Sequence, residues 1–132
     1  MLVEANDRST GGIFITFSGN CKKALTFYQT CFGGMLHFET FDHELHGYRE
    51  TLVIHGSLVS PCIVIHGSDL VHNEGRKIGN YLSIFLPCKN IYDRRALLEK
   101  LGSDRCSAVT RNYEDSLIEV TDAFDVRWVL GL

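Results

Sequence analysis

Apolar and polar residues follow two periods along the chain, and these periods occur twice in the same order. Residues 13–17 (Ile-Phe-Ile-Thr-Phe) are short, β-branched and aromatic, which predicts a strand. Asn20 then stands where a helix N-cap is expected. The helix that follows presents an apolar face at helical spacing, formed by Ala24, Phe27, Tyr28 and Cys31. Gly33 can adopt the left-handed conformation that ends a helix, so we expect the helix over residues 20–32.

Three further strands are expected after this helix, at residues 35–41, 48–55 and 58–66. Residues 42–47 predict a loop, and Gly56-Ser57 predicts a tight turn. Pro61 cannot donate to a strand ladder, so it bends the last strand or places it at an edge. These segments form a β-α-β-β-β module.

The same order of signals returns after a polar, glycine-containing connector at residues 67–79. A strand is expected at residues 80–88, followed by Asn90 as the N-cap and Gly102 as the stop of a second helix. Its buried stripe is expected at Ile91, Arg94 (through its aliphatic stem), Leu97, Leu98 and Leu101. Three more strands are expected at residues 106–112, 116–122 and 126–130.

The fold class is therefore α+β, with two tandem β-α-β-β-β modules. We expect one domain over residues 1–132, with module one at about 11–66, the connector at 67–79 and module two at about 80–132. Each helix covers one face of its sheet. Joining the modules would curve the two mixed sheets around a concave cavity, which is a natural small-molecule site.

Composition excludes some classes of function. The formal net charge is −3 and no basic stripe appears, which argues against a nucleic-acid partner. No apolar run approaches the length of about 20 residues that spans a bilayer, and no signal-peptide pattern is present, so we expect no membrane association and a cytoplasmic location. The five cysteines are scattered without a CxxC pair, which favours buried free thiols over zinc or disulfides.

Two segments carry a family resemblance: FSGNCKKALTFYQTCFGG at residues 17–34 and LIEVTDAFDVRWVL at residues 117–130. Together they resemble the PhnB-like branch of the vicinal oxygen chelate superfamily, which has the glyoxalase/bleomycin resistance/dioxygenase fold. The matching positions are Gly19-Asn20, Ala24, Phe27-Tyr28, Phe32-Gly33-Gly34, Thr121-Asp122, Phe124, Val126 and Trp128. The family glycine of the second motif is Asp125 here, and Asp tolerates a left-handed turn better than most residues.

Enzymes of this superfamily hold a divalent metal with His, Glu or Gln side chains from strands of both modules. The resemblance carries those positions onto residues 12–14, Arg49, Asn80 or Tyr81, and Val129. Only Asn80 is a usable, weak ligand, and the charge of Arg49 would repel a cation. We therefore expect no metal and no cofactor. No Gly-rich turn that would hold a methyl donor is present either.

Strand alternation sorts the two faces of each sheet. We expect Leu52, Ile54, Leu82, Ile84, Trp128 and Leu130 to face the helices. The opposite parity gives the expected ligand-binding residues, Phe14, Arg49, Thr51, Tyr81, Phe85, Glu119 and Arg127, together with Thr16 and Ser83. Aromatic walls with two arginines suit a planar or anionic organic ligand. The alternative is that these residues fill the cavity or meet a partner subunit.

Three other features concern histidine and cysteine side chains. His43 and His46, with Glu44 and Glu50 nearby, form either a metal site or a solvated turn. His55 and His66 end adjacent expected strands, where they either face each other or are ordinary surface residues. Cys62 lies in an apolar segment, where burial would make its thiol a poor nucleophile.

The sequence thus predicts a metal-free small-molecule-binding or catalytically degenerate protein with a small-molecule ligand as partner, forming a homodimer. Its catalytic residues cannot be assigned. Two alternatives stay open: a divalent-metal-dependent lyase, isomerase or dioxygenase, and a structural interaction module.

Overall fold

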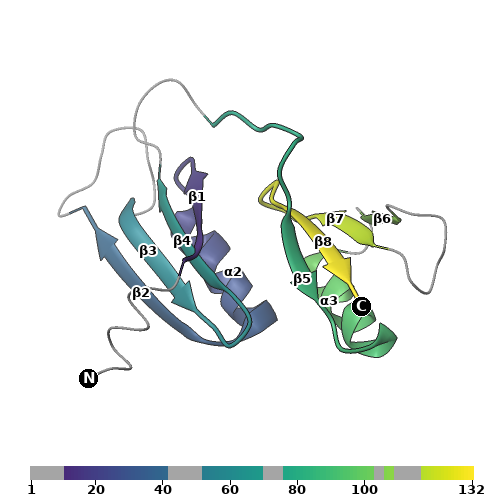
Figure 1. The fold of residues 1–132 in the computed structure, drawn as a ribbon. Helices are drawn as coiled ribbons and strands as arrows, with labels where there is room; N and C mark the ends of the chain where they lie inside the picture. Colours follow the sequence, from purple (N-terminus) through teal and green to yellow (C-terminus); the bar gives the residue numbers. More distant parts are fainter. Residues whose placement is uncertain (1–10, 42–51, 70–75, 103–105, 109–116) are drawn as a thin grey trace. The chain divides into compact units, whose positions relative to one another are not determined.

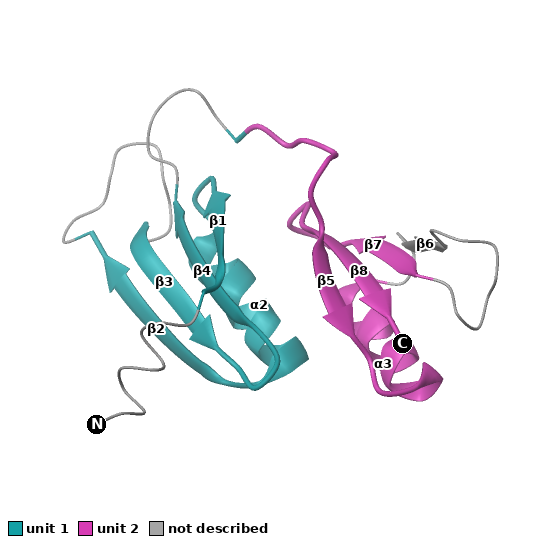
Figure 2. Cartoon of the chain, viewed as in Figure 1, with its two compact units in different colours: residues 1–76 teal, residues 77–132 magenta. Residues whose placement is uncertain are grey.

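The computed structural model describes residues 11–41, 52–69, 76–102, 106–108 and 117–132. It divides into two compact units, unit 1 (Met1–Arg76) and unit 2 (Lys77–Leu132), which are coloured separately in Figure 2. Within the described part of the chain, no helix is long and apolar enough to cross a membrane.

Unit 1 is a four-stranded sheet covered on one face by a helix (Figure 1). Its elements in chain order are β1 (Ile13–Phe17), α2 (Cys21–Phe32), β2 (Met35–Thr40), β3 (Val53–Val59) and β4 (Val64–Asp69). The strand order is β1-β4-β3-β2, with β1 parallel to β4 and the other pairs antiparallel. The core between the sheet and α2 contains Phe17, Leu25, Tyr28, Leu58 and Ile65, all fully buried.

Unit 2 repeats this topology. Its elements are β5 (Ile84–Pro87), α3 (Ile91–Leu101), β6 (Cys106–Ala108), β7 (Ile118–Thr121) and β8 (Arg127–Gly131). The order is β5-β8-β7-β6, again with the first and last strands parallel. Two β-α-β-β-β modules are therefore confirmed, and so is the burial of Trp128, Leu130 and Ile84.

The start of α2 is held by a carboxylate from a distant strand. Asp69, at the end of β4, accepts hydrogen bonds at Oδ1 from the backbone N–H of Gly19 (2.8 Å) and Cys21 (3.0 Å). Its Oδ2 accepts from Val53 N–H (2.9 Å), so one buried side chain joins the helix to two strands. Asn20 occupies the N-cap position but makes no side-chain cap hydrogen bond. The prediction that Asn20 caps the helix is therefore wrong, because Asp69 takes that role.

The other helix ends agree with the sequence. Asn90 Oδ1 accepts a hydrogen bond from Asp93 N–H at 2.8 Å, which confirms the cap of α3. Gly33 and Gly102 both have positive φ angles (73° and 121°) and donate their N–H groups back to the helices they end. Those conformations favour glycine over any other residue.

The second motif of the resemblance forms the turn between β7 and β8. Asp122 is fully buried, and its Oδ1 accepts from Phe124 N–H (2.8 Å) and Val126 N–H (3.1 Å). Its Oδ2 accepts from Trp128 Nε1–H at 2.9 Å, which satisfies the indole inside the core. Asp125 has φ 63°, so the left-handed conformation expected at this position is confirmed.

The sequence misplaced the hairpin turn between β3 and β4. Gly56 and Ser57 lie inside β3, and the turn is at residues 60–63, where Ser60 N–H donates to Ile63 O at 3.1 Å. A Cβ on Gly56 would lie 2.9 Å from Leu25 Cδ1 and from Phe38 Cδ1, so this glycine serves close helix–sheet packing. Cys62 is consequently an exposed turn residue and not a buried strand residue.

Three side chains predicted to face a helix are exposed. Leu82 is 70% exposed because β5 begins at Ile84, after the expected start at residue 80. Ile54 is 42% exposed, near the register irregularity between β2 and β3. Ile91 lies at the first turn of α3 and is also exposed. The expected start of the connector at residue 67 is wrong as well, since β4 continues to Asp69.

Candidate functional site: the sheet faces opposite the helices

The face of the unit 1 sheet opposite α2 is called here the open face of unit 1. On β1 the side chains of Ile15 and Phe17 are buried toward the helix, whereas Phe14 is 60% exposed on the other side. Cross-strand register places Phe14 beside His66 of β4, His66 beside Ser57 of β3, and Ser57 beside His37 of β2. Register partners share a face, so this row crosses the whole open face of unit 1.

Three rings on this face lie parallel to one another. His55 Nε2 and His66 Nδ1 are 2.9 Å apart and share a hydrogen bond, with ring planes inclined by 14° and centroids 5.1 Å apart. The Phe14 ring lies 6.4 Å from the His55 ring at an interplanar angle of 11°. Strands β1, β4 and β3 thus each supply one ring to a single cluster.

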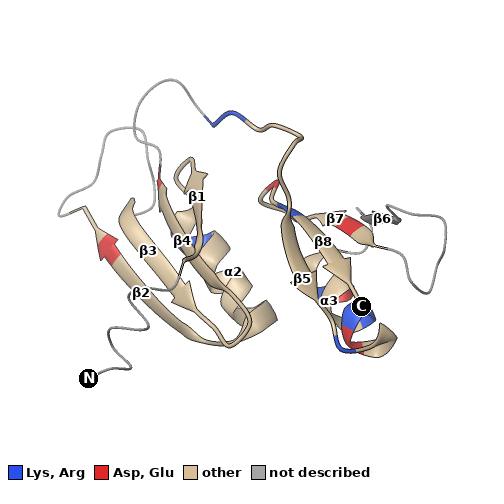
Figure 3. Cartoon of the chain, viewed as in Figure 1, with Lys and Arg blue, Asp and Glu red and all other residues tan. Residues whose placement is uncertain are grey.

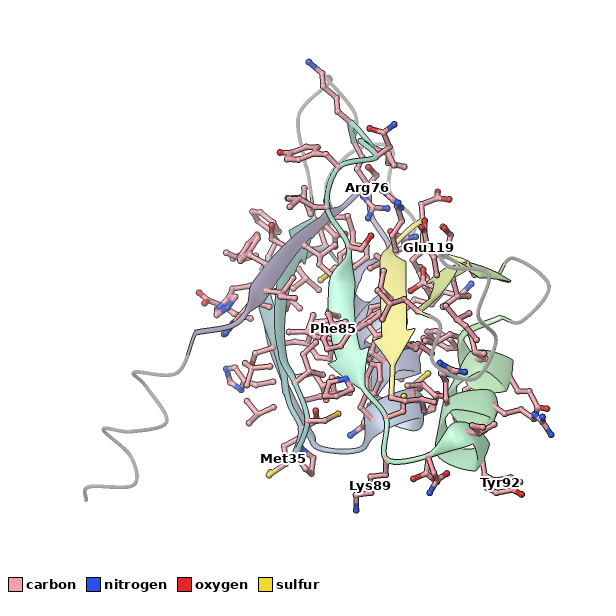
Figure 4. The ribbon with its side chains drawn as sticks, turned by 45° about the vertical axis from the view of Figure 1, so that its right-hand side comes forward. Met35, Arg76, Phe85, Lys89, Tyr92 and Glu119 are labelled. Carbon is pink, nitrogen blue, oxygen red and sulfur yellow. The ribbon has the colours of Figure 1, made fainter. Side chains whose placement is uncertain are left out.

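The open face of unit 2, opposite α3, is built on β5, β8 and β7. Register places Phe85 beside Val129, and Val129 beside Glu119. A Cβ on Gly131 would lie 2.9 Å from two atoms of the Phe85 ring, so the ring lies over the bare backbone of this glycine. Phe85 is nevertheless 55% exposed, and Figure 4 labels it on β5, with Glu119 labelled on β7.

Arg127 and Glu119 form an ion pair on this face. Arg127 Nη2 and Nε lie 2.7 Å and 2.8 Å from the same oxygen, Glu119 Oε1. The pair is half-buried, with side-chain exposures of 24% and 28%. Arg127 Nη1 is buried and has no hydrogen-bond partner among the described residues. This guanidinium therefore lacks one acceptor, and a buried donor without an acceptor costs about 1–3 kcal/mol.

Charge is sparse on the strands of both units (Figure 3). In unit 1, β1 and β3 contain no Asp, Glu, Lys or Arg, and β4 contains only Asp69, which faces the helix. Three charged residues of the described strands lie away from the helices: Glu39 of β2, which is exposed, and the paired Glu119 and Arg127 of unit 2. The open face of unit 2 combines Phe85 and Val129 with one ion pair, which resembles the usual composition of small-molecule sites. The open face of unit 1 is more polar, because histidine and serine side chains surround Phe14.

The structure places some of the site residues predicted from the sequence on the open faces, and others not. Phe14, Phe85, Glu119 and Arg127 lie on the open faces of their own units, and the structure brings Glu119 and Arg127 together. Tyr81 precedes β5 and is 84% exposed, so strand alternation does not place it. Arg49 and Thr51, and the histidines His43 and His46, lie outside the described residues. Ligand binding by any of them stays a prediction.

The residues carried over from the superfamily's metal ligands do not fit a metal. Val129 offers no donor atom, and it lies between Phe85 and Glu119 in the strand register. Residues 12–14 offer only glycine, isoleucine and phenylalanine side chains. Among the residues that the structure describes, no three His, Cys, Asp or Glu side chains are grouped so that they could hold a metal ion.

Cys21 is a buried thiol beside Asp69 at the start of α2. Burial, and to a smaller extent the negative charge of Asp69, together raise its pKa from 9.0 to about 12. Such a thiol stays protonated at neutral pH and is a poor nucleophile, so Cys21 belongs to the core and not to a reactive site.

Comparisons with known proteins identify the fold. No protein-family profile matches the sequence, and no curated protein sequence matches it. Among solved structures, protein PA1353 from Pseudomonas aeruginosa superposes with a TM-score of 0.76 at 21% identity, covering 92% of this chain and 96% of that one. The PhnB protein from Bacillus cereus gives 0.75 at 19% identity, covering 94% and 99%. The fosfomycin resistance protein FosX from Mesorhizobium loti gives 0.57 at 10% identity, covering 93% and 90%.

The chain therefore shares the fold of these proteins, the glyoxalase/bleomycin resistance/dioxygenase fold that the sequence resemblance predicted. The PhnB-like resemblance agrees with the high structural similarity to a PhnB protein. At these identities the likeness establishes the fold, and the chemistry of this chain has to be argued from its own residues.

Proposed function

We propose that this chain binds a small planar organic anion on the open face of unit 2, without a metal. The observation that carries the proposal is the guanidinium of Arg127. Glu119 holds its Nε and Nη2 atoms through one oxygen, while Nη1 has no acceptor within the described part of the chain.

The remaining edge of this guanidinium, formed by Nη1 and Nη2, matches a carboxylate or another two-oxygen anion. Glu119 fixes the orientation of the side chain, so little rotamer freedom is lost when a ligand binds. Reaching Nη1 requires neighbouring side chains to move, because this atom is buried. The compensation is a hydrogen bond for a donor that otherwise has none.

Phe85 supplies the apolar part of the site. Its ring is exposed on the same face, supported from below by Gly131 and flanked by Val129. Aromatic rings favour offset stacking with another flat ring, so a ligand with an aromatic or conjugated body and one anionic end fits this face.

Benzoate is the probe that tests this proposal, with benzamide as its uncharged analogue. Calorimetric titration is expected to detect benzoate binding and at least tenfold weaker benzamide binding. Arg127→Gln should weaken benzoate at least tenfold, whereas Arg95→Gln, on the exposed side of α3, should leave it unchanged. Equal affinity for the two probes, or equal effects of the two substitutions, would contradict the proposal.

Three further expectations are proposals of the same kind. The chain would act as a homodimer, which sedimentation equilibrium would reveal as twice the chain mass. It would reside in the cytoplasm, a compartment that suits the free thiols of Cys21 and Cys62. The two modules would act as one domain. Among the described residues, no group of three His, Cys, Asp or Glu side chains supports the metal-dependent alternative.

A further inference from the structure

The hydrogen-bonded pair His55–His66 and the parallel ring of Phe14 lie in unit 1. The proposed function rests on unit 2 and makes no use of them. Both histidines are accessible, and their hydrogen bond is exposed to solvent. The inference below stands independently of the role proposed for Arg127.

The distance between the facing nitrogens suits a shared proton and not a shared metal. His55 Nε2 and His66 Nδ1 are 2.9 Å apart, and the two rings are within 14° of a common orientation. That is the ordinary length of a hydrogen bond with nitrogen as donor. Two imidazole nitrogens bound to one tetrahedral zinc ion, at about 2.0–2.1 Å each, would stand about 3.3 Å apart with both lone pairs directed at the ion.

This hydrogen bond couples the two tautomers. If His55 Nε2 carries the proton, His66 Nδ1 accepts it, so His66 Nε2 must be an N–H and His55 Nδ1 a bare acceptor. If the proton lies on His66 Nδ1, both assignments reverse. In the neutral pair, the two outer nitrogens are therefore always one donor and one acceptor.

One added proton changes this pattern without breaking the inner hydrogen bond. The proton enters at the outer acceptor, and both outer nitrogens, His55 Nδ1 and His66 Nε2, are then donors. A second proton would place two N–H groups against each other across 2.9 Å. The pair is thus arranged to take up a single proton, and histidine gains its charge near neutral pH.

Few charged or titratable groups surround the pair. The only other described groups on this face that titrate or carry charge are His37 and Glu39 of β2, since Phe14 and Thr16 of β1, Ser57 of β3 and Ser68 of β4 do neither. Glu39 is the register partner of His55 and lies on the same face. Gly12 leaves room for the His66 ring, because a Cβ there would stand 3.2 Å from His66 Cδ2.

We propose that the His55–His66 pair, with Phe14 beside it, is a binding site for an aromatic carboxylate that is occupied with uptake of one proton from solvent. The proton enters at the outer acceptor nitrogen, and the carboxylate stays ionised and accepts a hydrogen bond from an outer N–H. No covalent bond to the ligand forms or breaks. The Phe14 ring, parallel to His55, faces the aromatic part of the ligand.

The test follows the imidazole resonances of the intact chain by NMR during benzoate titrations between pH 5.5 and 8.5. At low pH, benzoate is expected to shift the resonances of His55 and His66. Above the pH at which the pair becomes neutral, the dissociation constant read from these resonances should rise about tenfold per pH unit, as linkage to one proton requires. Benzamide should show no such pH dependence.

Substitutions separate the pair from its neighbours. The double variant, His55→Gln with His66→Gln, followed at the Phe14 ring, should abolish the pH dependence, because no imidazole of the pair then remains to take up the proton. His37→Gln is the matched control, an exposed histidine on the same face outside the pair, and should keep it. Amide spectra of each variant confirm that the fold is retained, so a lost effect reports on the site.

Three results would overturn this inference: affinity independent of pH, a slope that survives in the variant lacking both His55 and His66, or zinc titrated alone binding at one equivalent per chain through both imidazoles. Failure here leaves the proposed function intact if benzoate binding still depends on Arg127. Conversely, a pH-independent loss of binding in Arg127→Gln says nothing about the pair. The two proposals therefore fail separately.

Discussion

Replacement of Asp69 gives the most direct energetic test of how unit 1 is assembled. Its carboxylate accepts three backbone hydrogen bonds, two from the start of α2 and one from Val53 of β3, and the residue is only 7% exposed. Hydrogen bonds to a charged group contribute about 1.5–3 kcal/mol each, though such contributions do not add fully. Asp69→Ala leaves these N–H groups buried without an acceptor, so we expect a loss of about 3–5 kcal/mol in the free energy of unfolding.

Asp69→Asn separates charge from shape. The amide oxygen can still accept from Gly19 and Cys21, but the amide nitrogen would meet the Val53 N–H as a second donor. The expected loss is about 2 kcal/mol. Asn20→Ala is the control, because Asn20 makes no side-chain cap bond, and its cost should stay below about 0.5 kcal/mol.

Urea denaturation followed by circular dichroism measures all three variants. With a urea dependence of about 1–3 kcal/mol per molar, the Asp69→Ala midpoint should fall by about 2 M, and the Asn20→Ala midpoint should barely move. Equal shifts for the two alanine variants would refute the assignment of Asp69 as the capping residue.

Two further predictions concern single residues of the described structure. The Cys21 thiol, with its pKa raised from 9.0 to about 12, keeps its proton in the folded state after the unfolded chain has lost it, so stability should fall as pH rises from 9 toward 12. Chemical denaturation of wild type and Cys21→Ala across this range should show a steeper fall for wild type; parallel curves would exclude the effect. Asp125, at φ 63°, should tolerate Gly within about 0.5 kcal/mol, whereas Asp125→Val should cost at least about 1 kcal/mol, measured by thermal unfolding. A Val variant as stable as wild type would show that the turn does not need this conformation.

Sequence patterns predicted the fold correctly where the residue that specifies a feature lies close to that feature in the sequence. Helix stops at Gly33 and Gly102 depend on positive φ, and the Asn90 cap depends on a bond to a residue three positions on. Each of these signals lies within a few residues of the feature it specifies. The doubled order of such signals was enough to predict two modules of the same topology, which the strand order then confirmed.

Errors arose where a distant residue decided the outcome. Asn20 looked like a cap by position, but Asp69, 49 residues later, holds the helix start, and no local pattern links the two. Gly56 looked like a turn residue, yet its place is inside β3, where Leu25 and Phe38 need the space that a Cβ would fill. Tertiary packing overrode the usual turn preference of glycine in that case.

The candidate site was predictable in part for the same reason. Alternation placed Phe14, Phe85, Glu119 and Arg127 on faces away from the helices, because it needs only the strand positions. It could not predict the ion pair of Glu119 with Arg127, which depends on the pairing of β7 with β8. Similarly, the sequence suggested that His55 and His66 face each other or lie on the surface, and only the register of β3 and β4 brings them into contact.

Benzoate titration of chelator-treated protein tests the central claim, metal-free binding of a planar organic anion, most directly. Metal content is measured on the same sample before titration, and NMR follows the resonances of Phe85 as benzoate is added. The account predicts that the stripped protein binds benzoate as tightly as untreated protein, with the Phe85 ring resonances shifted on binding. Binding that disappears with the metal and returns when one equivalent of a divalent ion is restored would contradict it.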